Sequence, residues 1–355
     1  MNMAEIQNNL EELKLGEVAE ELQGLFQEQT PTLNEIITNA LAGKNEDTLG
    51  QLVEYLKTVF FSEFADFKTI FTTILILGIL SALFSELGRL FQNHQIADLS
   101  YYLIYLMMVM VLLQATGLGM EITTQVLGDI TDFSKILIPT YCLSIGLAGG
   151  STTAVIFYEL TLVIIFVVEK ILTVFIVPLI YAYVFLAAMN GIGPDARLDG
   201  ILKFLKKAIQ TILKLILTLI SCYGILQAMI TPVIDSVKSN SIQKLVAIIP
   251  GIGSYINTAT EVVYGSAVLV KNAVGIAGIL MLTVLCIVPL VKLSVLTVAL
   301  KLSGAVAGVV ADKRMNRCVE QVAEGNGMLL RAAATGMGLF VISIAVIAVT
   351  TNRGF

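Results

Sequence analysis

The chain has 355 residues, of which 56% are hydrophobic and only 14% are charged, and its mean hydropathy is +0.86. Soluble domains carry roughly a quarter charged residues, so this composition excludes water as the main solvent and indicates an integral membrane protein. The net charge of −5 and the lack of long Lys or Arg runs exclude the usual nucleic-acid-binding surface.

Residues 1–67 form an acidic segment that is predicted to lie outside the bilayer, on its extracytoplasmic side. Apolar residues such as Ile6, Leu10 and Leu13 recur at intervals near one helical turn, which is typical of amphipathic helix. Thr30-Pro31 predicts a helix start. We expect two or three short helices here, and no secretory signal, because residues 1–25 lack an apolar core behind basic residues.

From residue 68 onward the sequence predicts an all-α bundle of membrane helices. Residues 69–84 are uncharged, and 101–120 form an uncharged run about as long as a bilayer crossing requires. We expect about 8–10 transmembrane or re-entrant helices, with ten crossings preferred and eight as the alternative. The remaining apolar stretches are 136–150, 152–168, 171–189, 208–230, 245–265, 273–291, 293–310 and 332–350.

Two proline motifs suggest an internal duplication. Ile138-Pro139 and Val177-Pro178 reappear as Ile249-Pro250 and Val288-Pro289, each displaced by 111 residues. Coincidence in a biased alphabet is the alternative. If the duplication is real, the chain divides into the acidic segment 1–67, a first pair of membrane helices at 68–134, membrane repeat A at 135–241 and membrane repeat B at 242–355.

Basic residues predict the orientation in the membrane, because they concentrate in three connections. The positive-inside rule places such connections in the cytoplasm, and an even number of crossings then puts both termini outside. The residues are Arg89 in the first connection, Arg197, Lys203, Lys206 and Lys207 in the second, and Lys313, Arg314 and Arg317 in the third.

Three charged residues inside apolar stretches are candidates for lining a polar path: Glu159, Lys214 and Lys301. Each costs roughly 2.5 to 3.5 kcal/mol at the centre of a membrane helix. Glu159 is the strongest candidate, because apolar residues surround it. Snorkelling to the headgroups is the preferred interpretation of Lys214, which shares one helical stripe with Lys203, Lys207 and Gln210.

Small residues four apart predict close helix packing, because they lie on one helical face. The pairs are Gly146 with Gly150, and Gly304 with Gly308. A hinge or a broken-helix pore lining is the alternative, and re-entrant backbone of this kind must be shielded from lipid. Its main candidates are Pro250, Gly251 and Gly253.

No enzyme active site, cofactor site or metal site is predicted. The sequence lacks a G-x-x-x-x-G-K-[ST] phosphate loop, a G-x-S-x-G elbow and an H-E-x-x-H helix. His94 is the single histidine and is expected in a solvated loop, without the cysteine neighbours of a zinc site. A disulfide framework is not expected from the four distant cysteines, Cys142, Cys222, Cys286 and Cys318.

Several segments, taken together and in order, resemble the stage III sporulation protein AE family over most of the chain. These are the acidic lead Leu13–Val18, Ile138–Tyr141, the turn Leu147–Ser151, Ile249–Gly253 and Gly304–Ala311. Members of that family typically begin with a signal peptide, whose features residues 1–25 do not show.

The resemblance implies a multi-pass protein of the mother-cell-derived membrane around the forespore, within a channel or feeding apparatus. That apparatus supports late forespore gene expression through sigma factor G. The implied partners are other membrane proteins of the same operon, a separate cytoplasmic ATPase subunit, and a forespore membrane protein across the intermembrane space. A homo-oligomer is left open, and no catalytic residue is implied.

The leading hypothesis is therefore a non-enzymatic conduit subunit whose acidic lead meets partner proteins. The alternative is a secondary transporter with a midplane site formed by broken Gly/Pro helices, where Glu159 would lie.

Overall fold

The computed structural model describes residues 45–90, 94–147, 152–193, 197–246, 278–279, 282–283, 285–309 and 311–352. The elements of these ranges are helical, so the all-α prediction is confirmed. They are α4 (Asn45–Leu90), α5 (His94–Leu147), α6 (Thr152–Ile171), the π-helical turn η1 (Leu172–Ile176), α7 (Val177–Asn190), α8 (Asp199–Val246), the helical segment Leu285–Ala307, and α10 (Lys313–Asn352). The predicted helices of residues 1–44 lie outside the described residues.

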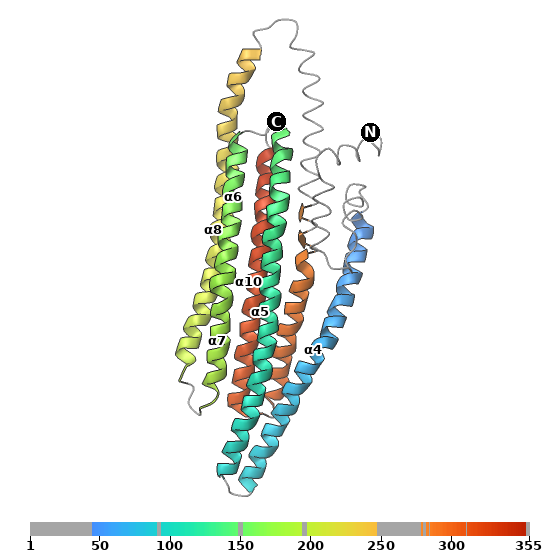
Figure 1. Cartoon of the computed structure of the whole chain (residues 1–355), viewed down its shortest axis with the longest axis vertical. Helices are drawn as coiled ribbons and strands as arrows, with labels where there is room; N and C mark the ends of the chain where they lie inside the picture. Colours follow the sequence, from blue (N-terminus) through green and yellow to red (C-terminus); the bar gives the residue numbers. More distant parts are fainter. Residues whose placement is uncertain are drawn as a thin grey trace.

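The helices lie side by side along the long axis of the molecule and alternate in direction (Figure 1). α4 descends in that view, α5 ascends, α6 and α7 descend together, α8 ascends, the segment Leu285–Ala307 descends and α10 ascends. α10 packs against α5, α7 and α8. In the most apolar stretch of α10, 56% of the residues are buried, which is the largest share of any described span. α10 is therefore the central helix.

Six helices are long and apolar enough to cross a membrane within the described ranges. Their outward faces carry large apolar side chains, of which Phe61, Phe175 and Phe204 are 70%, 73% and 72% exposed. Soluble proteins rarely expose apolar surface so continuously, and lipid satisfies it. The chain is therefore a polytopic membrane protein, with spans at Phe60–Phe84, Asp98–Ile138, Val163–Asn190, Asp199–Leu226, Leu285–Ala307 and Lys313–Ile344.

The expected division into ten crossings is wrong in three places, one of which is the boundary between 273–291 and 293–310, because Lys292 lies inside the continuous helix Leu285–Ala307. Residues 101–120 and 136–147 lie on the single helix α5, whose 54 residues span about 80 Å at 1.5 Å per residue. Likewise, 152–168 and 171–189 belong to one continuous rod of α6, η1 and α7. The polar residues between these stretches interrupt hydrophobicity without interrupting the helix. His94, which was expected in a loop, is the first residue of α5.

The π-helical turn keeps the α6–α7 rod continuous where a proline enters it. Pro178 has no backbone N–H, and its ring would collide with the carbonyl four residues earlier in a regular α-helix. One residue before it, the Val177 N–H bonds instead to the Leu172 carbonyl five residues back. This wider turn absorbs the proline without a break in the span.

All three basic connections share one end of the bundle. α4 and α7 end there, and α5, α8 and α10 begin there, at the lower end in Figure 1. Two described spans lie between each basic connection and the next, so the three connections fall at the same end of the bundle. This arrangement agrees with the charge pattern of the sequence.

We expect single cysteines that replace Gly200 and Lys313 to react with a membrane-impermeant maleimide from the same side of the membrane. A cysteine in place of exposed Lys57, which precedes the span Phe60–Phe84 at the other end of α4, is expected to react from the opposite side. The measurement is labelling of right-side-out and inverted vesicles in a cysteine-free background. Labelling of residues 200 and 313 from opposite sides would contradict the arrangement.

Candidate functional site

A pair of stacked tyrosines on α5 holds the basic end of the bundle together. The Tyr101 and Tyr105 rings lie 5.6 Å apart, the Tyr101 hydroxyl donates to the Gly191 carbonyl at 2.8 Å, and the Tyr105 hydroxyl donates to the Ala188 carbonyl. The Arg314 guanidinium lies 3.9 Å from the centre of the Tyr101 ring. Tyr101 therefore joins the end of α7 to the start of α10.

Capping side chains fix both helix starts at this end. Asp312 accepts a hydrogen bond from the Arg314 backbone N–H at 2.8 Å and from its Nε at 3.2 Å, so it caps α10 and positions the guanidinium. Asn190 donates to Asp199 Oδ1 at 2.7 Å and accepts from the Leu198 N–H at 2.9 Å. These bonds brace the connection between α7 and α8.

Glu324 of α10 links two further helices near the basic end. It accepts a hydrogen bond from the Tyr183 hydroxyl of α7 at 3.1 Å and pairs with Lys206 Nζ of α8 at 2.7 Å. A second interhelical ion pair joins Glu63 of α4 to Lys292 at 3.0 Å. Both pairs offset charges that would otherwise face hydrocarbon.

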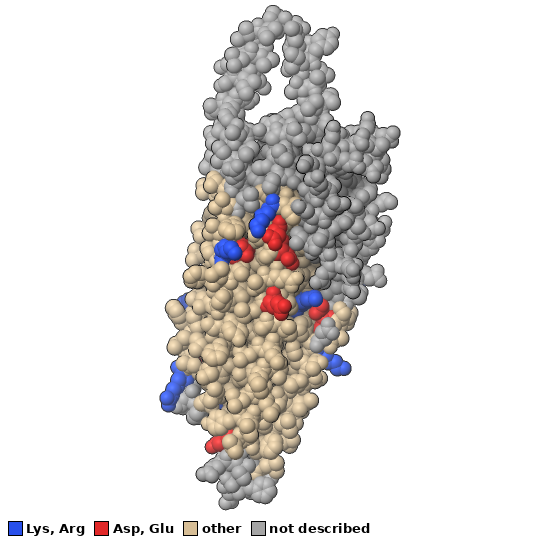
Figure 2. Space-filling view, viewed as in Figure 1, with Lys and Arg blue, Asp and Glu red and all other residues tan. Residues whose placement is uncertain are grey.

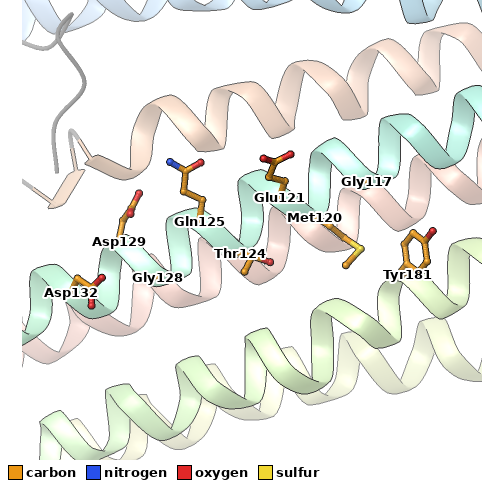
Figure 3. A pocket seen from close by; sticks show the side chains of 9 residues that line it. All are labelled: Gly117, Met120, Glu121, Thr124, Gln125, Gly128, Asp129, Asp132 and Tyr181. Atoms are coloured by element: carbon orange, nitrogen blue, oxygen red, sulfur yellow. The ribbon is translucent and has the colours of Figure 1, made fainter.

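One face of α5 lines a groove of about 760 Å³ that is open to the outside of the bundle. Glu121, Gln125, Asp129 and Asp132 follow steps of four, four and three, which places them on one side of the helix. Figure 3 shows Glu121, Gln125 and Asp129 projecting side by side, with Tyr181 of α7 at the far end. The lining residues are Gly117, Met120, Glu121, Thr124, Gln125, Gly128, Asp129, Asp132 and Tyr181.

The groove is electrostatically negative. Asp132 forms an ion pair with Lys135 at 2.8 Å, whereas Glu121 is exposed and Asp129 is half-buried, and neither has an ion-pair partner among the described side chains. Acidic side chains gather on this face of the molecule (Figure 2). Within the described ranges, His, Cys, Asp and Glu form no group of three that could hold a metal ion. The carboxylates of Glu121 and Asp129 make the groove suited to a positively charged side chain.

A buried amide ties α5 to α10 beneath this groove. The fully buried Asn326 donates to Thr116 Oγ1 at 3.2 Å and to the Val322 carbonyl at 3.1 Å, while its Oδ1 has no hydrogen-bond partner among the described residues. A Cβ atom at Gly119 would lie 2.7 Å from that oxygen, so only glycine leaves room for it. Interhelical hydrogen bonds of this kind contribute about 0.6 kcal/mol on average in membranes.

The structure does not bring the charged candidates of the sequence together. Lys214 and Lys301 are exposed on the outer faces of their helices, and neither lines the groove. Glu159 belongs to α6, but its side chain lies outside the described residues. The predicted roles of all three stay predictions.

The predicted glycine pairs are described only in part. A Cβ atom added at Gly304 would lie 3.3 Å from Val319 Cγ1, and one added at Gly308 would lie 2.7 Å from Asn316 Nδ2. Val319 and Asn316 belong to α10, so both glycines pack closely against that helix. Gly146 lies in α5, and its surroundings fall outside the described residues. Gly150, Pro250, Gly251 and Gly253 lie outside the described residues altogether.

Sequence reasoning missed the groove. Glu121 to Lys135 fall between the predicted apolar stretches 101–120 and 136–150, so the predicted spans do not include their acidic side chains. The steps of four, four and three from Glu121 to Asp132 were the available signal. The sequence contains no pattern that predicts Tyr181 in the groove, because Tyr181 reaches it only through the packing of α7 on α5.

Six apolar spans, lipid-facing side chains and a lateral polar groove define a polytopic α-helical membrane protein. The chain belongs to the stage III sporulation protein AE family, because the family model described as Stage III sporulation protein AE matches residues 32–351. It is similar to the stage III sporulation protein AE of Bacillus subtilis (strain 168), with 23% identity over 354 residues that cover 97% of this chain and 87% of that protein. No solved structure matches it. The predicted family resemblance is confirmed.

Substitution of Gly191 by alanine is expected to lower the stability of the bundle. The added Cβ would meet the Tyr105 hydroxyl, which is held by the Ala188 carbonyl and cannot simply move away. Overpacking of this kind costs about 1 to 3 kcal/mol. The measurement is thermal unfolding of the purified protein in lipid nanodiscs.

The matched control is Gly200→Ala, because nothing lies within 4 Å of a Cβ atom at Gly200. It should unfold at the temperature of the unmodified protein. Equal unfolding temperatures for Gly191→Ala and Gly200→Ala would show that the tyrosine pair does not clamp the end of α7.

Proposed function

We propose that the chain is a non-enzymatic, multi-pass subunit of a secretion-like channel complex that links mother cell and forespore. Membership of the stage III sporulation protein AE family supports the sporulation role. In this proposal the protein lies in the mother-cell-derived outer forespore membrane and supports late forespore gene expression through sigma factor G.

The filled interior of the bundle is the observation that carries the subunit role. Tyr105, Phe133, Tyr183 and Phe340 are fully buried, and the Phe133 and Phe340 rings pack edge to face at 5.5 Å. These aromatic side chains fill space between α5, α7 and α10 among the described helices. A conduit would therefore form between this chain and its neighbours rather than through it.

The charge asymmetry supports the orientation that we propose. Exposed Lys203, Lys207, Lys313 and Arg317 lie toward the end where α8 and α10 begin, and the positive-inside rule places that end in the mother-cell cytoplasm. The N-terminal segment and the end of α10 would then face the intermembrane space.

The proposed partners follow from this orientation and from the sequence. A separate cytoplasmic ATPase would approach the basic end, since the sequence has no phosphate-cradling loop of its own. Other stage III sporulation membrane proteins would pack laterally, and a forespore membrane protein would meet the extracytoplasmic end.

The secondary transporter remains the rival, because the groove places Glu121 and Asp129 within a membrane span. Carboxylates at such a depth often bind transported cations or protons. A secondary transporter would work as a single kind of chain, whereas the proposed channel subunit would need its partner proteins.

The test has two arms, both with the full chain. In the first, the tagged protein is purified from sporulating cells after mild cross-linking, and we expect the operon partners to be recovered with it. In the second, the protein is reconstituted alone in vesicles, and we expect no gradient-coupled solute uptake. Uptake by such vesicles would favour the transporter, and failure to recover any operon partner from intact complexes would contradict the subunit role.

A further inference from the structure

Lys214 occupies an unfavourable position on the outer face of α8. It lies 15 residues after Asp199, where α8 begins, and seven residues after Lys207, within a candidate membrane span. Its neighbours Leu215 and Leu219 are 51% and 64% exposed, which marks this face as lipid-facing in an isolated chain. At 1.5 Å per residue Lys214 lies about 22 Å along α8 from Asp199.

Among the described side chains, Lys214 has no ion-pair partner. An unpaired ammonium facing the centre of a bilayer costs roughly 2.5 to 3.5 kcal/mol on insertion scales. Lys206, two turns earlier, avoids this cost by pairing with Glu324. A carboxylate from another molecule would do the same for Lys214.

Contacts within the bundle give the depth of Lys214. Lys206 of α8 bonds to Glu324 of α10, and Asn326, two residues further along α10, bonds to Thr116 of α5. α5, α8 and α10 run in the same direction (Figure 1). Lys214 therefore lies about 12 Å beyond Lys206, or about 9 Å beyond the level of Thr116.

Glu121 lies at nearly the same depth. It is five residues beyond Thr116 on α5, which corresponds to about 7.5 Å along the helix. Its side chain is exposed in the groove and, like Lys214, has no ion-pair partner within the described part of the chain. Two opposite, unpaired charges thus face outward from different helices at one level of the membrane.

We propose that two copies of this chain associate side by side in the membrane, with the α8 face around Lys214 of one copy seated in the α5 groove of the next. The Lys214 ammonium pairs there with the Glu121 carboxylate. Gln125 and Asp129 lie one and two turns beyond Glu121 and add polar and negative groups to the same groove. This inference does not depend on the sporulation function.

A second copy fits the groove better than an unrelated helix does. Copies of one chain share their orientation in the membrane, so the equal depths of Lys214 and Glu121 are kept when they meet. An unrelated basic helix could neutralise Glu121, but it would leave Lys214 facing lipid. The two surfaces differ, so the contact is head-to-tail, and an open assembly keeps one free groove at one end and one free α8 face at the other until a ring closes.

Disulfide cross-linking between two differently tagged copies tests the contact directly. One copy carries Glu121→Cys and the other Lys214→Cys, both in a background with Cys142, Cys222, Cys286 and Cys318 replaced by alanine. We expect oxidation in native membranes to join the two tags covalently. The matched control pairs Glu121→Cys with Lys301→Cys, since Lys301 is also an exposed lysine within a span, and we expect at least about tenfold less cross-linked product.

Charge reversal gives the second readout, the mass of the particle in lipid nanodiscs. We expect Glu121→Lys alone and Lys214→Glu alone to shift the protein from oligomer to monomer, and the double reversal to restore the oligomer. Lys301→Glu should leave the oligomer intact.

Three results would overturn the proposal. These are a monomeric unmodified protein in native membranes, single reversals that leave the oligomer unchanged, and a residue 121 cysteine that cross-links to a different protein but not to residue 214. The mass of the particle is measured in lipid nanodiscs, without sporulating cells. A failure of this proposal can therefore be distinguished from a failure of the proposed function.

Discussion

Hydrocarbon offers no hydrogen-bond partner to the backbone, and this constraint governs the rest of the structure. Every amide in a spanning segment must be bonded within its own helix, so the described chain forms long, uninterrupted rods. Where Pro178 removes a donor, the π-helical turn at Leu172–Ile176 keeps the rod continuous instead of breaking it. The chain reverses direction only at the ends of the rods, where Asn190 and Asp312 satisfy the exposed backbone groups.

The same constraint sorts the polar side chains into two kinds. Those inside the bundle find partners either on a neighbouring helix, as Asn326 does with Thr116 and Glu63 does with Lys292, or on their own helix, as Thr123 does with the Gly119 carbonyl. Glu121 and Lys214, in contrast, face outward within spans and find none among the described residues. Unpaired charges on the outer surface of the described helices therefore support the proposal that the protein works through lateral contacts.

Composition and charge patterning predicted the helical class, the membrane location and the shared end of the basic connections. The family was predicted from the resemblance of ordered motifs such as Ile138–Tyr141 and Gly304–Ala311. Sequence patterns could not predict the length of the helices, because Glu121 to Lys135 lowers hydropathy without disturbing helical hydrogen bonding. The groove also escaped prediction, since Tyr181 reaches it from a helix that is distant in sequence. Lys214 was visible in the sequence, but its depth relative to Glu121 depends on the contacts of α10 with both helices.

The central claim is that lipid surrounds the outer faces of a closed bundle. Spin labels in place of Phe175 and Met110, whose side chains are 73% and 59% exposed, test it through collision rates with oxygen and with a water-soluble nickel complex in nanodiscs. The account predicts frequent collisions with oxygen and few with nickel at both positions. Frequent nickel collisions at either position would mean that water reaches this surface, and the account would be wrong.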